Sequence, residues 1–201
     1  MAKISKSAQL KFDEAYHLAF GRVKRDWAEA FKLWSVSAEL GHPRAMFYLG
    51  TCFDCGKGVQ KDPYKAFQWY LCAAKAGHAD ANYNVGIYHA TGELGTVDNK
   101  QKVFWYKRAA ARGIIDAQRD LGYSYFYGEG IRRDQKKAIF WYKKAAASGD
   151  AKANYNLGLC YLYGTGVVQS KRWARHYFSK ASENGHKLAR RNLIELSSDS
   201  A

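Results

Sequence analysis

The chain has 201 residues, of which 47% are apolar and 15% aromatic, so it can bury a core and does not have the composition of a disordered protein. Its formal net charge is +14, and residues 100–201 hold 20 Lys and Arg against 8 Asp and Glu, a surplus of 12. A charge of this size attracts acidic partners without naming them. No apolar run has the length of a membrane span and the first residues lack the apolar segment of a signal peptide, which predicts a cytoplasmic protein with reduced cysteines.

The first predicted element is a capping helix in residues 1–25, where the stretch from Lys6 to Gly21 suits one helix. Five glycines then follow at intervals of 36 residues, from Gly41 to Gly185. Other residue types recur with them, notably a Leu-Gly or Val-Gly pair after each of the first four glycines and a Trp-Tyr or Tyr-Phe pair before the next. Residues 26–185 therefore predict repeats of helix A, turn, helix B and turn, and residues 186–201 predict a C-terminal capping helix and tail.

The turn between helices A and B offers one sign of chemistry. The segment YGEGIRRD, from Tyr127 to Asp134, has two glycines and two arginines that could hold a phosphate. Related segments are CGKGVQKD at 55–62, YGTGVVQS at 163–170 and, with altered glycine spacing, TGELGTVD at 91–98. This repetition favours a turn in which Gly adopts a positive φ and a polar residue caps the next helix. The predicted caps are Asp26, Asp62, Asp98, Asp134 and Ser170.

The combined pattern A-x-x-x-L-G-x-x-Y, G-x-G-V, D and K-A-x-x-W-Y-x-x-A-A-x-x-G resembles the Sel-one-like repeat (SLR) family, a relative of the tetratricopeptide repeats. One unit carries it at Ala153, Leu157, Gly158, Tyr161, Gly164, Gly166 and Val167, and another at Asp134, Lys137, Ala138, Trp141, Tyr142, Ala145, Ala146 and Gly149.

The resemblance implies an all-α fold, an α/α superhelix (solenoid) of stacked helix-turn-helix repeats with period 36, in a single domain over residues 1–201. We expect about eleven helices in a right-handed superhelix, with the A helices on the concave face and the B helices on the convex face. In this prediction the Trp-Tyr pairs fill the space between neighbouring repeats, while Ala and Gly let the helices approach closely.

No catalytic or cofactor motif is present, so we predict a non-catalytic protein without a cofactor or a bound metal. Cys52 and Cys55 form a C-x-x-C late in a helix A, where a packing role is favoured. A zinc site would need Cys72 and a fourth ligand that no pattern names. Polar loop residues are expected just after the inter-unit glycines, at His42, His78 and His186.

The resemblance further implies that a partner binds in the concave groove formed by the A helices. Rings and amides gather there near the Leu-Gly pairs, which suits a peptide or a partner helix, and Arg119 could pair with a carboxylate of the ligand. The alternative is that several of these rings pack between neighbouring repeats. The predicted partner-binding residues are Phe47, Tyr83, Asn84, Ile87, Arg119, Tyr123, Phe126, Tyr155, Asn156 and Leu159.

Most basic residues of the C-terminal half are expected on the B helices or in the turns before them. They are Lys100, Lys102, Lys107, Arg108, Arg112, Arg132, Arg133, Lys136, Lys137, Lys143, Lys144, Lys171, Arg172 and Arg175. A solvated helix surface is the favoured reading, and a docking surface for an acidic protein or RNA is the alternative. The aromatic residues are expected mainly in the core and groove rather than among these cations, which argues against nucleic acid.

These features predict a scaffold or adaptor that binds a peptide or protein, with an acidic partner allowed by the charge. Two alternatives use the same fold: an inhibitor or immunity protein for a cognate toxin or effector, and a nucleic-acid-binding protein that uses the basic convex face. A third alternative is an enzyme or metal protein that uses Cys52, Cys55 and Cys72.

Overall fold

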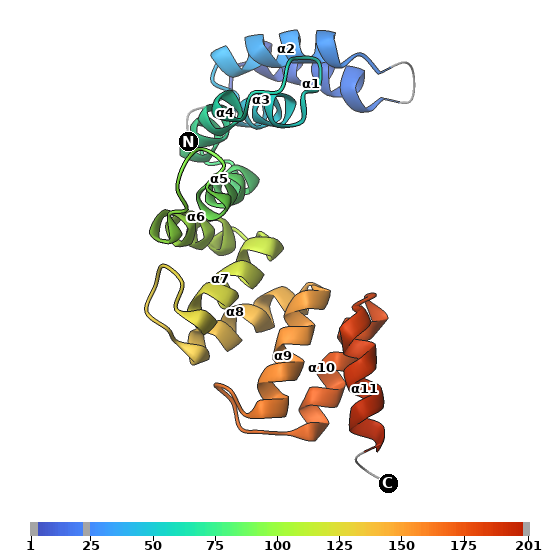
Figure 1. Ribbon diagram of the computed structural model, residues 1–201. Coiled ribbons are helices and arrows are strands. Elements are labelled where there is room, and N and C mark those ends of the chain that lie inside the picture. The colour runs from blue at the N-terminus through green and yellow to red at the C-terminus, as the bar shows by residue number, and fades with distance from the viewer. Residues whose placement is uncertain (1–3, 22–24, 199–201) are drawn as a thin grey trace. The chain divides into compact units, whose positions relative to one another are not determined.

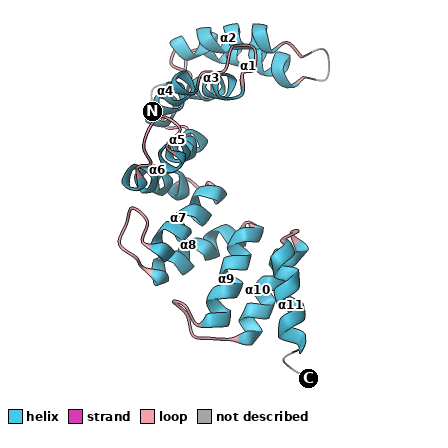
Figure 2. Cartoon of the chain, in the orientation of Figure 1, coloured by secondary structure: helices cyan, strands magenta, loops and turns pink. Residues whose placement is uncertain are grey.

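The computed structural model describes residues 4–21 and 25–198, and within these ranges the chain forms eleven α-helices and no strand (Figure 1, Figure 2). The helices are α1 (Lys6–Phe20), α2 (Trp27–Glu39), α3 (Pro43–Cys55), α4 (Pro63–Lys75), α5 (Ala79–Thr91), α6 (Asn99–Ala111), α7 (Ile115–Tyr127), α8 (Gln135–Ala147), α9 (Ala151–Tyr163), α10 (Lys171–Glu183) and α11 (Lys187–Ser198). Equivalent helices begin 36 residues apart, so the predicted all-α repeat fold is confirmed. The A helices are α3, α5, α7 and α9, and the B helices are α2, α4, α6, α8 and α10.

The chain divides after Asp98 into two compact units. Unit 1 contains α1 to α5, and unit 2 contains α6 to α11. Inside each unit, every helix packs against the next helix along the chain. The division follows loop 92–98, in which the sequence changes its glycine spacing, and the predicted organisation as a single domain stays a prediction. None of the described helices combines the length and the apolar character that crossing a bilayer would require.

The segment YGEGIRRD is a turn. Gly128 ends α7 in the left-handed region, with φ +80°, and Gly130 has φ +69°. A Cβ atom on Gly130 would collide with the carbonyl oxygen of Asn99, so this glycine lets the turn lie directly on the start of α6. Asp134 then caps α8 by accepting a hydrogen bond of 3.0 Å from the backbone N–H of Lys137.

The predicted helix caps are confirmed at four of the five positions: Asp26, Asp62, Asp134 and Ser170 each accept a hydrogen bond from a backbone N–H in the first turn of the next helix. Loop 92–98 differs from the other turns in the surroundings of its second glycine, Gly95. A Cβ on Gly95 would meet no atom within 4 Å, so this loop lacks the close contact that Gly130 makes in unit 2.

The core between helices depends on contacts between a ring and a glycine. Tyr142 of α8 is only 2% exposed, and a Cβ on Gly122 of α7 would lie 2.7 Å from its ring carbons. The sequence predicts that both rings of each Trp-Tyr pair fill the space between repeats, whereas Trp141 is only half-buried. In the Trp141-Tyr142 pair the second ring is therefore the one that fills the core, and glycine is needed opposite because it has no Cβ.

Candidate functional site

All ten predicted partner-binding residues lie on A helices, but they divide between the two units. Unit 1 holds Phe47 on α3 and, on α5, Tyr83, Asn84 and Ile87. Unit 2 holds the other six, which line two adjoining pockets between α7 and α9: Arg119, Tyr123, Phe126, Tyr155, Asn156 and Leu159.

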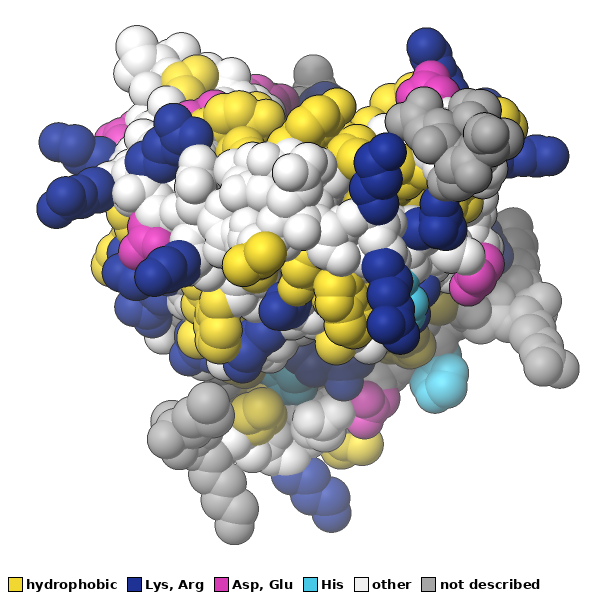
Figure 3. Space-filling view, turned by 90° about the horizontal axis from the view of Figure 1, so that it is seen from below, with side chains coloured by type: hydrophobic (Ala, Val, Ile, Leu, Met, Phe, Trp, Pro, Cys, Tyr) yellow, Lys and Arg dark blue, Asp and Glu magenta, His cyan; other side chains and the backbone are white. Residues whose placement is uncertain are grey.

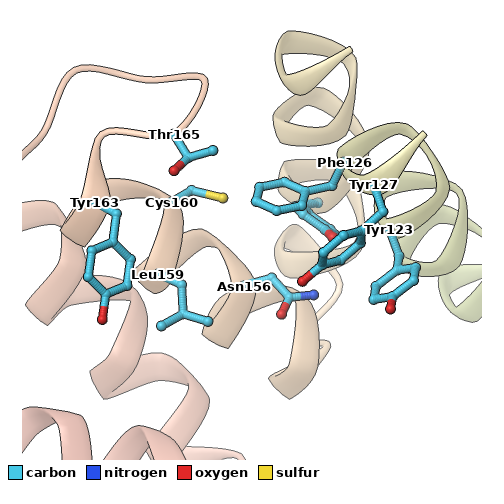
Figure 4. Close-up of a pocket in the computed structure, with 9 residues that line it drawn as sticks. Tyr123, Phe126, Tyr127, Asn156, Leu159, Cys160, Tyr163 and Thr165 are labelled. Carbon is cyan, nitrogen blue, oxygen red and sulfur yellow. The ribbon is translucent and has the colours of Figure 1, made fainter. Parts of the chain in front are cut away.

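The first of these pockets has aromatic walls and a volume of about 240 Å³. From α7, Tyr123, Phe126 and Tyr127 extend toward it, and α9 supplies the opposite side, as Figure 4 shows. Tyr142 of α8 also lines it. The lining residues from α9 and the turn after it are Asn156, Leu159, Cys160, Tyr163 and Thr165. We call this the aromatic pocket.

Three rings of the aromatic pocket are exposed, and those on α7 contact one another. Tyr123, Tyr127 and Tyr163 are 44%, 58% and 70% exposed, which is unusual for side chains of this size. The ring centroids of Tyr123 and Tyr127 are 4.4 Å apart, and those of Phe126 and Tyr127 are 4.9 Å apart with an edge contact. A ligand would therefore meet a surface that is already arranged, with little side-chain entropy left to lose.

The second pocket is polar, has a volume of about 340 Å³ and shares Tyr123 and Asn156 with the first. Its further lining residues are Arg119, Asp120, Lys152, Tyr155 and His186. Together the two pockets form one continuous hollow along α7 and α9, apolar at one end and charged at the other. We call it the unit 2 groove.

Arg119 forms ion pairs within the chain through Nε and Nη1, and its predicted pairing with a carboxylate of a ligand stays a prediction. Its guanidinium donates to Asp116 at 2.6 Å, to Asp120 at 2.8 Å and to Asp150 at 3.2 Å. Burial alone would lower the pKa of Arg119, but the hydrogen bonds to Asp120 and Asp116 and the charge of Asp150 outweigh it and raise the pKa. The exposed Lys152 is better placed to meet a carboxylate of a ligand.

Phe47 and Tyr155 stack against residues of the next repeat. Phe47 lies parallel to His78 at 4.5 Å between centroids, and Tyr155 lies on His186 at 4.2 Å. This is the packing alternative that the sequence left open for some of the predicted rings. As binding residues, both remain predictions, together with the unit 1 residues Tyr83, Asn84 and Ile87.

The three histidines are helix caps, not simply polar loop residues as predicted. The Nδ1 atoms of His42, His78 and His186 accept backbone N–H donors of Ala45, Ala81 and Ala189 at 3.3 to 3.4 Å. Burial lowers the pKa of each imidazole, so the neutral form that can accept this hydrogen bond is favoured. Sequence reasoning missed this role because the usual caps are Ser, Thr, Asp and Asn.

Two residues of the aromatic pocket, Tyr127 and Tyr163, were also missed. They end α7 and α9, and the same repeat position holds Cys55 and Thr91 in unit 1. The signal that could have found them is the change from small side chains to rings at this position, which happens only in the C-terminal repeats.

Two of the four cysteines are buried, as the packing interpretation expects. Cys52 and Cys160 are buried, and burial raises the pKa of each thiol to about 12. Cys55 and Cys72 are exposed, and all four are free thiols. Among the described residues, no three His, Cys, Asp or Glu side chains lie close enough together to hold a metal ion.

Comparison with known families gives one match that extends over most of the chain. A family model described as Sel1 repeat matches residues 15–42, 43–78, 79–114, 115–150 and 151–186. No curated protein shows significant similarity to the chain.

Solved structures with related folds include a protective antigen present in uropathogenic Escherichia coli strains displaying an SLR fold, with 30% identity and a TM-score of 0.90. The match covers 94% of this chain and 41% of that protein, so this chain spans less than half of its length. A Sel1 repeat protein from Oxalobacter formigenes has 28% identity and a TM-score of 0.83 over 92% of this chain and 74% of that one. An immunity protein from Pseudomonas aeruginosa has 24% identity and a TM-score of 0.57 over 94% and 70%.

Proposed function

Because the chain belongs to the Sel1 repeat family, whose repeats mediate protein interactions, we propose that it is a non-catalytic adaptor that binds a protein or peptide in the unit 2 groove. The aromatic pocket takes one apolar or aromatic side chain of the partner. Asn156 lies at the junction of the two pockets and supplies an amide for the partner's backbone.

The observation that carries this proposal is the group of exposed rings around the aromatic pocket. Tyr is among the residue types that most often anchor protein interfaces. The aromatic pocket, with a volume of about 240 Å³, has room for one side chain of a partner. The partner then extends over the polar pocket, where Lys152 can pair with an acidic residue.

Members of the family generally are non-catalytic scaffolds, and no residue of the groove is arranged as a nucleophile with a base. Cys160 lines the aromatic pocket, but burial raises the pKa of its thiol to about 12, so it is protonated and unreactive at neutral pH.

The test is the loss of the exposed rings. We expect the variant Tyr123→Ala, Tyr127→Ala, Tyr163→Ala to keep the helical circular dichroism of the wild type, because none of these side chains fills the core. Peptides selected from a random display library on the wild type should bind this variant at least tenfold more weakly, since each anchor ring contributes on the order of 1 kcal/mol or more. The selected peptides should share one apolar residue.

A matched control removes three exposed apolar side chains outside the groove: Tyr64→Ala, Val168→Ala and Ile194→Ala. It should bind the selected peptides as the wild type does. Equal binding by the groove variant and the control would show that the groove is not the binding site.

The alternative of an inhibitor or immunity protein stays a prediction. The Pseudomonas immunity protein shares the fold at 24% identity, and a likeness at that level carries no function. A cytoplasmic location also stays a prediction.

A further inference from the structure

The B helices of unit 2 carry exposed rings among their cations. Phe104 on α6 and Phe140 on α8 occupy the same repeat position and are 48% and 52% exposed. Arg108 lies 5.7 Å from the centroid of Phe104, and Lys144 lies 5.3 Å from that of Phe140. These two rings are exceptions to the expected gathering of aromatic residues mainly in the core and groove. Basic and hydrophobic side chains also lie next to one another on the face that Figure 3 displays.

A basic pocket of about 490 Å³ lies on the same side of unit 2, between α6, α8 and the turn before α8. Lys107, Arg132, Arg133 and Lys137 line it, against one carboxylate, Asp134. The ammonium groups of Lys107 and Lys137 lie 5.9 Å and 5.7 Å from the centroid of the Tyr125 ring, one from each helix. Asp134 is occupied as the cap of α8 and by an ion pair of 3.4 Å with Lys137. The pocket therefore has a surplus of positive charge directed toward solvent.

The repeat fold does not require these residues. The hollow at the related place in unit 1, about 350 Å³, is lined by Tyr64, Phe67, Gln68, Tyr88, His89, Leu94, Thr96 and Asp98. It contains no Lys or Arg. The positions 36 residues before Lys107, Arg132 and Arg133 hold Leu71, Thr96 and Val97, and Gln68 stands where unit 2 has Phe104. The repeat 36 residues earlier therefore keeps its packing without a cation or a ring at these positions.

We propose that this surface of unit 2 binds single-stranded nucleic acid, with successive phosphates paired to the four cations of the basic pocket and bases stacked on Phe104 and Phe140. Single-stranded chains offer both of the groups that this surface can recognise, since their phosphates pair with cations and their unpaired bases stack on rings. A duplex keeps its base faces inside, and the carboxylates of an acidic peptide pair with cations but do not stack on rings. The site is separate from the unit 2 groove and does not depend on the proposed adaptor function.

The probe is a fluorescein-labelled oligouridylate about 20 nucleotides long, titrated with the protein and followed by fluorescence anisotropy at roughly 50 mM and 200 mM salt. Four phosphate contacts give a slope of about −2.8 for log K against log salt, so the affinity of the wild type should fall about 50-fold over this fourfold change. Arg132→Glu with Arg133→Glu leaves two contacts at most, and its loss over the same range should be about sevenfold or less.

The rings are tested separately. Phe104→Ala with Phe140→Ala should weaken binding by about tenfold or more for each ring at both salt concentrations, with the slope unchanged, because stacking releases no counterions. Both side chains are half-exposed, so the variant should keep the circular dichroism of the wild type. Lys61→Glu with Lys75→Glu is the matched control in unit 1, because it changes the net charge equally and Lys61 is the repeat equivalent of Arg133. It should bind nearly as the wild type does, and so should the groove variant.

Three competitors test which kind of anionic partner this surface binds: a duplex of the same length, poly-glutamate and anionic phospholipid vesicles. The proposal predicts that the single strand is preferred and that only its binding depends on Phe104 and Phe140. Poly-glutamate that competes equally, with no effect of the ring variant, would assign the surface to an acidic protein instead. Preferred binding of the duplex or the vesicles, or equal binding by the Arg132, Arg133 variant and the unit 1 control, would overturn the proposal.

Discussion

Replacing Gly122 by Ala should destabilise the protein, although the same change stabilises most helices. In an open helix interior, Ala is favoured over Gly by about 1 kcal/mol. Here the new Cβ would lie 2.7 Å from two ring carbons of Tyr142 and 3.3 Å from the carbonyl oxygen of Ala138. Tyr142 is 2% exposed and cannot swing away, so overpacking should cost about 1–3 kcal/mol and cancel or exceed the gain.

The coupling can be measured with a double-mutant cycle. Tyr142→Ala alone should cost about 3–5 kcal/mol. In that background Gly122→Ala should stabilise by about 1 kcal/mol, because the ring that it would strike is gone. The two effects of Gly122→Ala should therefore differ by about 1–3 kcal/mol, read from urea unfolding followed by circular dichroism with an unchanged denaturant slope.

The reasoning fails if Gly122→Ala stabilises both backgrounds by the same amount, because the ring would then not rest on the glycine. A second readout links this contact to function. Tyr142 lines the aromatic pocket, so Gly122→Ala should also weaken binding of the peptides selected on the wild type, although residue 122 does not line the pocket itself.

Three further predictions concern buried polar groups. Glu129→Ala should cost roughly 1–3 kcal/mol in urea unfolding, because it leaves the nearly buried ammonium of Lys102 without its carboxylate at 2.8 Å, whereas Lys102→Met should cost less since Glu129 is well solvated. The lowered pKa values of His42, His78 and His186 mean that the folded state favours the neutral imidazoles. Their contribution to the free energy of unfolding is therefore present above the unfolded pKa of about 6.5 and is lost as the pH falls through the folded pKa values. The melting temperature should drop between about pH 7.5 and pH 5, and it should drop less in the variant His78→Asp. A thiol reagent at about pH 8 should label Cys55 and Cys72 quickly, and Cys52 and Cys160 only after unfolding; fast labelling of a third thiol would contradict the burial of that pair.

The fold could be predicted from the sequence because each repeat carries the same pattern of helix and turn residues. Asp134 before α8 and Gly128 after α7 are local signals, and their recurrence at 36 residues turns weak local preferences into a firm prediction. Which ring of the Trp-Tyr pair fills the core was not predictable in this way. It depends on which of the two faces Gly122, and that is decided by the angle at which α8 packs on α7.

The groove was predicted less well because exposure depends on the next repeat. At one position of helix A, Phe47 and Tyr155 are covered by His78 and His186, which follow 31 residues later. The equivalent pair in the third repeat is Arg119 with Asp150. Aromatic stacking and an ion pair therefore serve the same purpose of joining one repeat to the next.

These joining pairs have a consequence for where a partner can bind. A side chain that holds two repeats together cannot also move to meet a ligand without loosening them, so the start of helix A serves stability. The side chains that are open to a ligand lie later in the helix, at Tyr123, Tyr127 and Tyr163, beyond the reach of the next cap. A repeat protein can change these positions without disturbing its stacking. That separation explains why the rings of the aromatic pocket vary between repeats while the core contacts around Gly122 recur.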